Sequence, residues 1–200
     1  PRHKLTYTPH FNNTDHYVTM FAQFEVNQGS SSSSHASSYG IPNGIISPTT
    51  GSMLSQTSTG TGQWRWVSML YSAVYSYKEG KYSATASVRR DGSTKFGPKR
   101  RWGNFPAISG RWNISDESWM EWAKGDPKLS MLSLRAGWGM TGNQPGREYL
   151  HYTTYKTTGS YLGSNTIAQG GLRLTDLKWE IKREYNLGSD IGFFDDKLFA

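Results

Sequence analysis

The chain has 200 residues, a formal net charge of +7 and no cysteine. These values exclude a helical membrane protein, because no run approaches the roughly 18 apolar residues that a spanning helix needs. They also exclude disulfides and thiolate metal sites. Aromatic residues make up 14% of the chain, a content that suits the girdles of a transmembrane β-barrel or a Tyr-rich soluble β-sandwich. Because the chain starts at Pro1 and ends at Ala200, just after a predicted turn, we expect it to be a fragment of a longer protein.

Two-residue alternation of apolar and polar side chains predicts the first four strands, at residues 4–11, 16–27, 63–78 and 82–89. In the third, Val67, Met69 and Tyr71 face one side while serines dominate the other, since successive side chains of a strand point to opposite faces. Residues 28–62 are polar and contain the serine run 30–34. Such a segment buries too little apolar surface to offset its ordering entropy, so we expect a mobile loop.

The second half of the chain continues the same alternation. It predicts strands at about 105–114, 129–140 and 183–194, and the start of an eighth at 197–200. Ser115 followed by Asp116 and Glu117 favours a helix N-terminus, so one or two helical turns are expected before Gly125-Asp126-Pro127.

The connections between these strands alternate in length. They are short at 12–15, 79–81 and 195–196, intermediate at 115–127, and long at 28–62, 91–103 and 141–180. Consecutive antiparallel strands reverse direction, so the long connections all fall on one rim. This sorting favours an all-β, antiparallel transmembrane barrel, with apolar side chains toward lipid and polar ones toward the lumen, over a Greek-key sandwich.

Several motifs resemble one family of transporters. The most specific are Val88-Arg89-Arg90-Asp91-Gly92-Ser93, Thr141-Gly142-Asn143 and Leu177-Lys178-Trp179-Glu180. Residues 75–82, 96–98, 101–106, 112–117, 134–140, 184–188 and 192–194 add further matches in the same order. Over about residues 70–197 the chain resembles the SusC/RagA family of TonB-linked outer-membrane transporters.

The resemblance implies that residues 1–200 are part of one barrel domain of about 22 strands, whose plug lies outside this piece. It implies TonB-dependent import of glycans or oligopeptides across the bacterial outer membrane. The implied partners are a SusD-like surface lipoprotein and, through a region outside this piece, the TonB–ExbB–ExbD complex. A passive porin or adhesin-type barrel and a soluble glycan-binding β-sandwich remain as alternatives, and the substrate class stays open.

Six residues are candidates for substrate binding. Arg89, Arg111 and Arg135 are predicted on inward faces, where they contact substrate or pair with carboxylates of the lumen or plug. Trp102, Phe105 and Trp179 are predicted at loop bases on the long-loop rim, where they stack on sugar rings or pack as girdle and loop residues.

No enzyme, cofactor or metal site is predicted. The five histidines (His3, His10, His16, His35 and His151) lack metal-ligand spacing, and the adjacent acids Asp195 and Asp196 are too few to hold calcium. The basic cluster at Arg89-Arg90 and residues 99–101 is confined to one loop, without a nucleic-acid-binding module. It suits the anionic surface of an outer membrane better than a nucleic acid.

Overall fold

The computed structural model describes residues 1–39, 53–123, 129–194 and 198–199 of the chain. Eight strands form one antiparallel sheet in the order β1-β2-β3-β4-β5-β6-β9-β10. Their bounds are β1 Arg2–Tyr7, β2 His16–Tyr39, β3 Met53–Tyr77, β4 Tyr82–Ser93, β5 Trp102–Asn113, β6 Leu129–Asn143, β9 Glu180–Phe193 and β10 Leu198–Phe199. A separate hairpin, β7 (Tyr155–Tyr161) and β8 (Ser164–Gln169), lies within the connection between β6 and β9. No helix in these described ranges is long and apolar enough to span a membrane.

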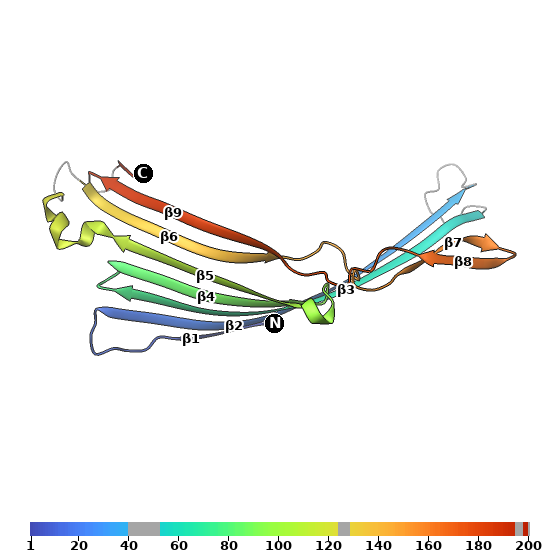
Figure 1. Cartoon of the computed structure of the whole chain (residues 1–200), viewed down its shortest axis with the longest axis horizontal. Helices are drawn as coiled ribbons and strands as arrows, with labels where there is room; N and C mark the ends of the chain where they lie inside the picture. Colours follow the sequence, from blue (N-terminus) through green and yellow to red (C-terminus); the bar gives the residue numbers. More distant parts are fainter. Residues whose placement is uncertain (40–52, 124–128, 195–197, 200) are drawn as a thin grey trace.

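Strands that follow one another in the chain are neighbours in the sheet, apart from the inserted β7–β8 hairpin. The short connections gather at one end of the molecule, while the extended β2–β3 hairpin and β7–β8 lie at the other (Figure 1). The predicted up-and-down order is therefore confirmed. The turn at 195–196 and the predicted helix stop at 125–127 lie outside the described residues.

The prediction of a mobile loop across 28–62 is wrong for the part that is described. β2 and β3 stay paired from His16↔Tyr77 to Tyr39↔Met53, with one register shift between Ser37 and Ser38. The ladder pairs the backbone groups that face the partner strand, without requiring the serine side chains to be buried. Residues 40–52 lie outside the described part.

Smaller differences concern element ends. β4 extends to Ser93 and β5 begins at Trp102, which shortens the predicted 91–103 loop to a segment that contains the 3₁₀ turn η2 (Pro98–Arg100). The helical turns predicted after Ser115 are present as η3 (Ile114–Asp116) and η4 (Ser118–Ala123). Ser115 lies inside η3 rather than at its N-cap, which is Asn113.

Strand register joins the predicted apolar positions into one surface. One cross-strand row contains Leu5, Ala22, Tyr71, Val88 and Pro106, from β1 to β5. A parallel row continues to β9: Met20, Ala73, Ala86, Ile108, Trp138 and Tyr185. We call this side of the sheet the apolar face. The side that carries Ser68, Ser72, Ser87 and Ser109 is called the polar face.

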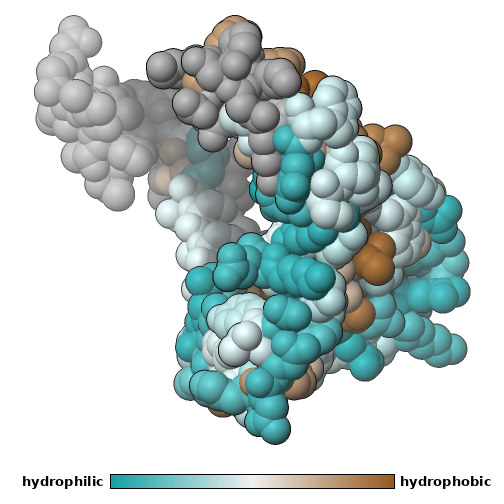
Figure 2. Space-filling view, turned by 90° about the vertical axis from the view of Figure 1, so that its left-hand side faces the viewer, coloured by the Kyte–Doolittle hydropathy of each residue, from teal (hydrophilic) through white to brown (hydrophobic). Residues whose placement is uncertain are grey.

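The apolar face is open to its surroundings. Its large side chains are exposed, including Leu5, Tyr71, Ile108, Tyr185 and Leu187. Figure 2, viewed from the short-turn end, shows hydrophobic side chains along the upper right flank of the molecule. A β-sandwich would cover such a face with a second sheet, but the other described sheet is only the β7–β8 hairpin at the far end (Figure 1).

Buried apolar side chains form two small clusters at the ends of the strands. Phe96, Phe105 and Trp179 pack together beside Leu177 at the long-loop end. Ile114 and Met120 pack beside Leu129 and Leu132 near the helical turns. The clusters anchor the connections to the ends of the sheet, and neither contains the exposed side chains of the apolar face.

Candidate functional site

An aromatic row crosses four strands at the short-turn end of the apolar face. The ring of His16 lies 4.9 Å from that of Tyr77, Tyr77 lies 6.1 Å from Tyr82, and Tyr82 lies 6.4 Å from Trp112. Cross-strand register produces this row, since His16↔Tyr77, Tyr77↔Tyr82 and Tyr82↔Trp112 are paired positions. Aromatic rings placed side by side at one level are typical of the interfacial girdle of a membrane barrel.

Trp102 marks the opposite border of the same face. It lies ten residues before Trp112 on β5, so both indoles point to the apolar face. At about 3.4 Å per residue and a strand tilt of about 40°, ten residues advance about 26 Å across a membrane, close to the height of a barrel's apolar band. Trp102 is 43% exposed and packs 5.1 Å from the guanidinium of Arg90.

Phe105 and Trp179 lie on the other side of the sheet from Trp102. Phe105 is only 5% exposed and Trp179 only 8%. The Trp179 ring lies 4.7 Å from Phe96 and 5.4 Å edge-on from Phe105, while its Nε1–H donates to the Arg101 carbonyl oxygen over 3.1 Å. The structure therefore uses this pair to pack the loop base, and it does not bring the three predicted aromatic residues together.

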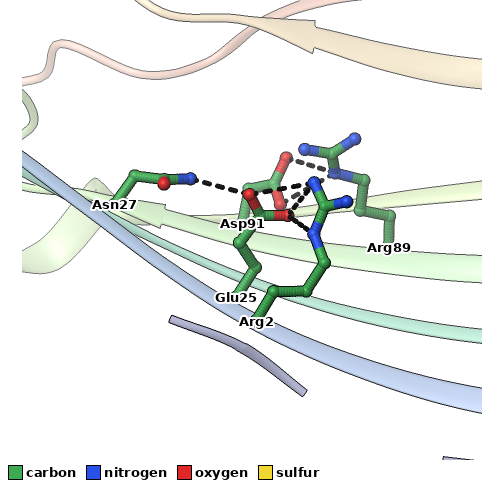
Figure 3. A network of polar contacts seen from close by, with 5 residues as sticks. All are labelled: Arg2, Glu25, Asn27, Arg89 and Asp91. Carbon is green, nitrogen blue, oxygen red and sulfur yellow. Dashed lines mark hydrogen bonds and ion pairs between the residues drawn. The ribbon is translucent and has the colours of Figure 1, made fainter. Parts of the chain in front are cut away.

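The polar face carries a balanced charge network near its long-loop end (Figure 3). Arg2 donates two hydrogen bonds of 3.2 Å to Glu25, which also accepts one of 3.0 Å from Asn27. Arg89 lies 2.9 Å from the Asp91 carboxylate, whose side chain is 8% exposed. Arg2 thus pairs with Glu25 across β1 and β2, whereas Arg89 pairs with Asp91 on the same strand, β4.

A second charge cluster lies toward the short-turn end of the polar face. Arg135 Nη2 is 2.5 Å from Asp190 Oδ1, and Arg111 Nη2 is 3.7 Å from Asp190 Oδ2. The Ser133 hydroxyl donates to the same carboxylate over 3.0 Å. The structure thus brings Arg111 and Arg135 together around one acid and places Arg89 in the separate network of Figure 3.

Glu117 anchors the helical turns to the strands at the short-turn rim. Its carboxylate lies 2.7 Å from Lys81 Nζ, and it accepts hydrogen bonds from the Tyr82 hydroxyl and, over 3.1 Å, from Trp112 Nε1–H. The Lys81 ammonium, followed by these two donors, lowers the pKa of Glu117 to about 2. The same bond raises the pKa of Lys81. Glu117, predicted only as a helix N-terminal acid, therefore ties β4 and β5 together.

Sequence reasoning missed the acids that pair with the predicted arginines. Asp91 lies two residues after Arg89, a spacing that puts both side chains on one face of a strand. Asp190 could be assigned to the polar face by parity, but its pairing with Arg111 and Arg135 depends on β9 being next to β6. Within the described ranges, no group of three or more His, Cys, Asp or Glu residues could hold a metal ion.

No family model matches the chain, but individual proteins do. It is 40% identical over 133 residues to the TonB-dependent receptor P39 of Formosa agariphila, a match that covers 66% of this chain and 12% of the receptor. It is 32% identical over 125 residues to the TonB-dependent receptor SusC of Bacteroides thetaiotaomicron, covering 59% of this chain and 12% of that receptor.

Solved structures share the fold. The RagAB peptide transporter superposes with a TM-score of 0.87 at 21% identity, covering 99% of this chain and 22% of that chain. The RagAB peptide importer in its open-open state gives a TM-score of 0.80 at 20% identity, covering 98% and 21%. The matches to the two receptors named above span about an eighth of the length of each receptor. In sequence the chain is similar to a segment of TonB-dependent receptors, SusC among them, and in fold it is similar to a segment of the RagAB transporter.

Proposed function

We propose that this chain forms part of the wall of a TonB-dependent importer in the bacterial outer membrane. The observation that carries the proposal is the open apolar face opposite a polar face with ionic networks. In water, a contiguous apolar surface that crosses seven strands would drive aggregation or be covered. Against lipid it is the required outer surface of a barrel, and the polar face then borders the lumen.

The proposal assigns each end of the sheet to one side of the outer membrane. Tight turns face the periplasm and longer connections face the cell exterior, as in other outer-membrane barrels. The extended β2–β3 hairpin and the β7–β8 hairpin then project outward. A SusD-like surface lipoprotein would cover this end, and TonB–ExbB–ExbD would act from the periplasm through a part of the protein outside residues 1–200.

The proposed cargo is a large nutrient, either a glycan or an oligopeptide. One structural relative is named a peptide transporter, whereas the polar face offers serine, threonine and guanidinium groups that suit either class. Arg89 faces the lumen toward its external end, so we propose it as a contact for incoming solute. Arg111 and Arg135 face the lumen nearer the periplasmic end. Phe105, Trp179 and Trp102 are proposed to hold the loop base and the outer girdle.

Energised uptake by the full-length protein tests this function. Cells that express it are given labelled oligosaccharides in one arm and labelled oligopeptides in the other, with and without a protonophore. Import that requires this protein and stops with the protonophore supports the proposal, and the arm that accumulates identifies the cargo class. Solute equilibration that persists with the protonophore would instead indicate a passive porin.

A further inference from the structure

The polar face contains a hollow of about 490 Å³ toward the short-turn end. Its floor consists of small side chains on adjacent strands: Ser83 and Thr85 on β4, Ser109 on β5, Gly137 on β6 and Gly188 on β9. Arg111 and Arg135 also line it. Small residues beside two long cationic ones leave room for another group to approach the guanidiniums from the lumen side.

Within the described part of the chain, the ion pairs at this hollow do not balance. Two guanidiniums share the single carboxylate of Asp190 at 2.5 and 3.7 Å, so the trio keeps one formal positive charge. The Asp190 side chain is only 14% exposed, whereas the Arg135 side chain is 56% exposed. The network in Figure 3, by contrast, matches Arg2 and Arg89 with Glu25 and Asp91.

The accessible side of the trio is therefore cationic. Guanidinium presents its donors in a planar fork that matches a carboxylate. In the closed barrel of the proposed function this side would border an enclosed lumen, and a charge held away from bulk water there requires a partner because its desolvation is otherwise uncompensated. A transported solute leaves the lumen and cannot serve as a permanent counter-charge, whereas a side chain of the protein itself can.

We infer that the Arg111/Arg135 hollow is a carboxylate site, occupied by an Asp or Glu side chain from another part of the same polypeptide inside the barrel. This inference rests on the proposed function, because the polar face borders an enclosed lumen only within a closed barrel. It goes beyond that function by assigning a chemical partner to one place on the wall.

Zero-length cross-linking of the full-length protein in outer membranes tests the inference. Arg135→Lys keeps the positive charge and introduces a primary amine at the hollow, in an Asp190→Asn background that removes the local acid. A water-soluble carbodiimide activates a nearby carboxyl group; the amine attacks the activated carbonyl, an amide bond forms, and the carbodiimide leaves as its urea. Peptide mass spectrometry then identifies both partners.

The expected product joins the lysine introduced by Arg135→Lys to an Asp or Glu outside residues 1–200, without any added solute. Arg111→Lys in the same background provides a second variant and should capture the same acid. Arg89→Lys is the matched control, expected to couple to Asp91, which lies 2.9 Å from the native guanidinium. Heat-modifiable migration on gels confirms that each variant is assembled.

Two results would overturn the inference. One is that neither Arg135→Lys nor Arg111→Lys forms a cross-link while the Arg89→Lys control does. The other is coupling that requires added carboxylate-bearing solute, which would make the site a ligand site. Either failure is distinguishable from failure of the proposed function, because protonophore-sensitive uptake by the wild-type protein is measured independently.

Discussion

A single charge placed on one side of β3 or the other distinguishes a lipid-facing wall from a water-facing sheet. Ala73 lies on the apolar face, in the row with Met20, Ala86 and Ile108. Ile108 lies four residues from Trp112 and six from Trp102 on β5, so this row is near mid-depth between the two tryptophans. Ser72, the adjacent residue, points to the polar face beside Phe21 and Ser87.

Arginine at the lipid-facing midplane of an outer-membrane barrel costs about 2–4 kcal/mol, whereas lumen substitutions lack this penalty. Ala73→Arg in the full-length protein should therefore lower the folding equilibrium constant in liposomes by about 30- to 700-fold, at about 1.4 kcal/mol per tenfold. Ser72→Arg, at nearly the same depth and with the same added charge, should lose much less.

The assay is urea unfolding of the full-length protein in liposomes, followed by heat-modifiable migration on gels. The difference between the two variants is the decisive quantity, since both introduce the same side chain on the same strand. Equal losses, or a larger loss for Ser72→Arg, would refute the assignment of the apolar face to lipid.

Three further predictions concern the rims and the hairpin. The pKa of Glu117 is lowered from 4.5 to about 2, so its ion pair should stabilise the protein fully above pH 4.5 and lose this effect as the pH falls toward 2. The difference in unfolding free energy between wild type and Glu117→Gln should therefore shrink over that range. A difference that stays constant would contradict this role. Phe105→Ala should cost about 3–5 kcal/mol because the ring is buried against Trp179, whereas the exposed Trp102→Ala should cost less in the same unfolding assay; equal losses would be inconsistent with the packing. Alternate amides within residues 30–34, those that donate across the β2–β3 ladder, should exchange slowly with deuterium. Exchange of all five amides at the rate of an unstructured loop would restore the mobile-loop expectation.

Local alternation was sufficient to predict most of the strands and the composition of their faces. A two-residue period places Val67, Met69 and Tyr71 on one side regardless of which strands are neighbours. Connection lengths then ordered the strands, since an up-and-down sheet pairs consecutive segments. Local patterning had no means of detecting the paired part of 28–62, because a polar hairpin is held by backbone hydrogen bonds that leave no hydrophobic signature.

Chain sequence alone thus determined the fold class, the two faces and the arginines that lie on the polar one. Tertiary structure decided which acids those arginines meet: Asp190 reaches Arg135 because β9 pairs with β6 across the inserted β7–β8 hairpin. It also buried Trp179 against Phe96 and Phe105, which lie far from it in the sequence. The physical reason is that burial and ion pairing depend on distances between strands remote in sequence, whereas the direction of a side chain depends only on its own strand.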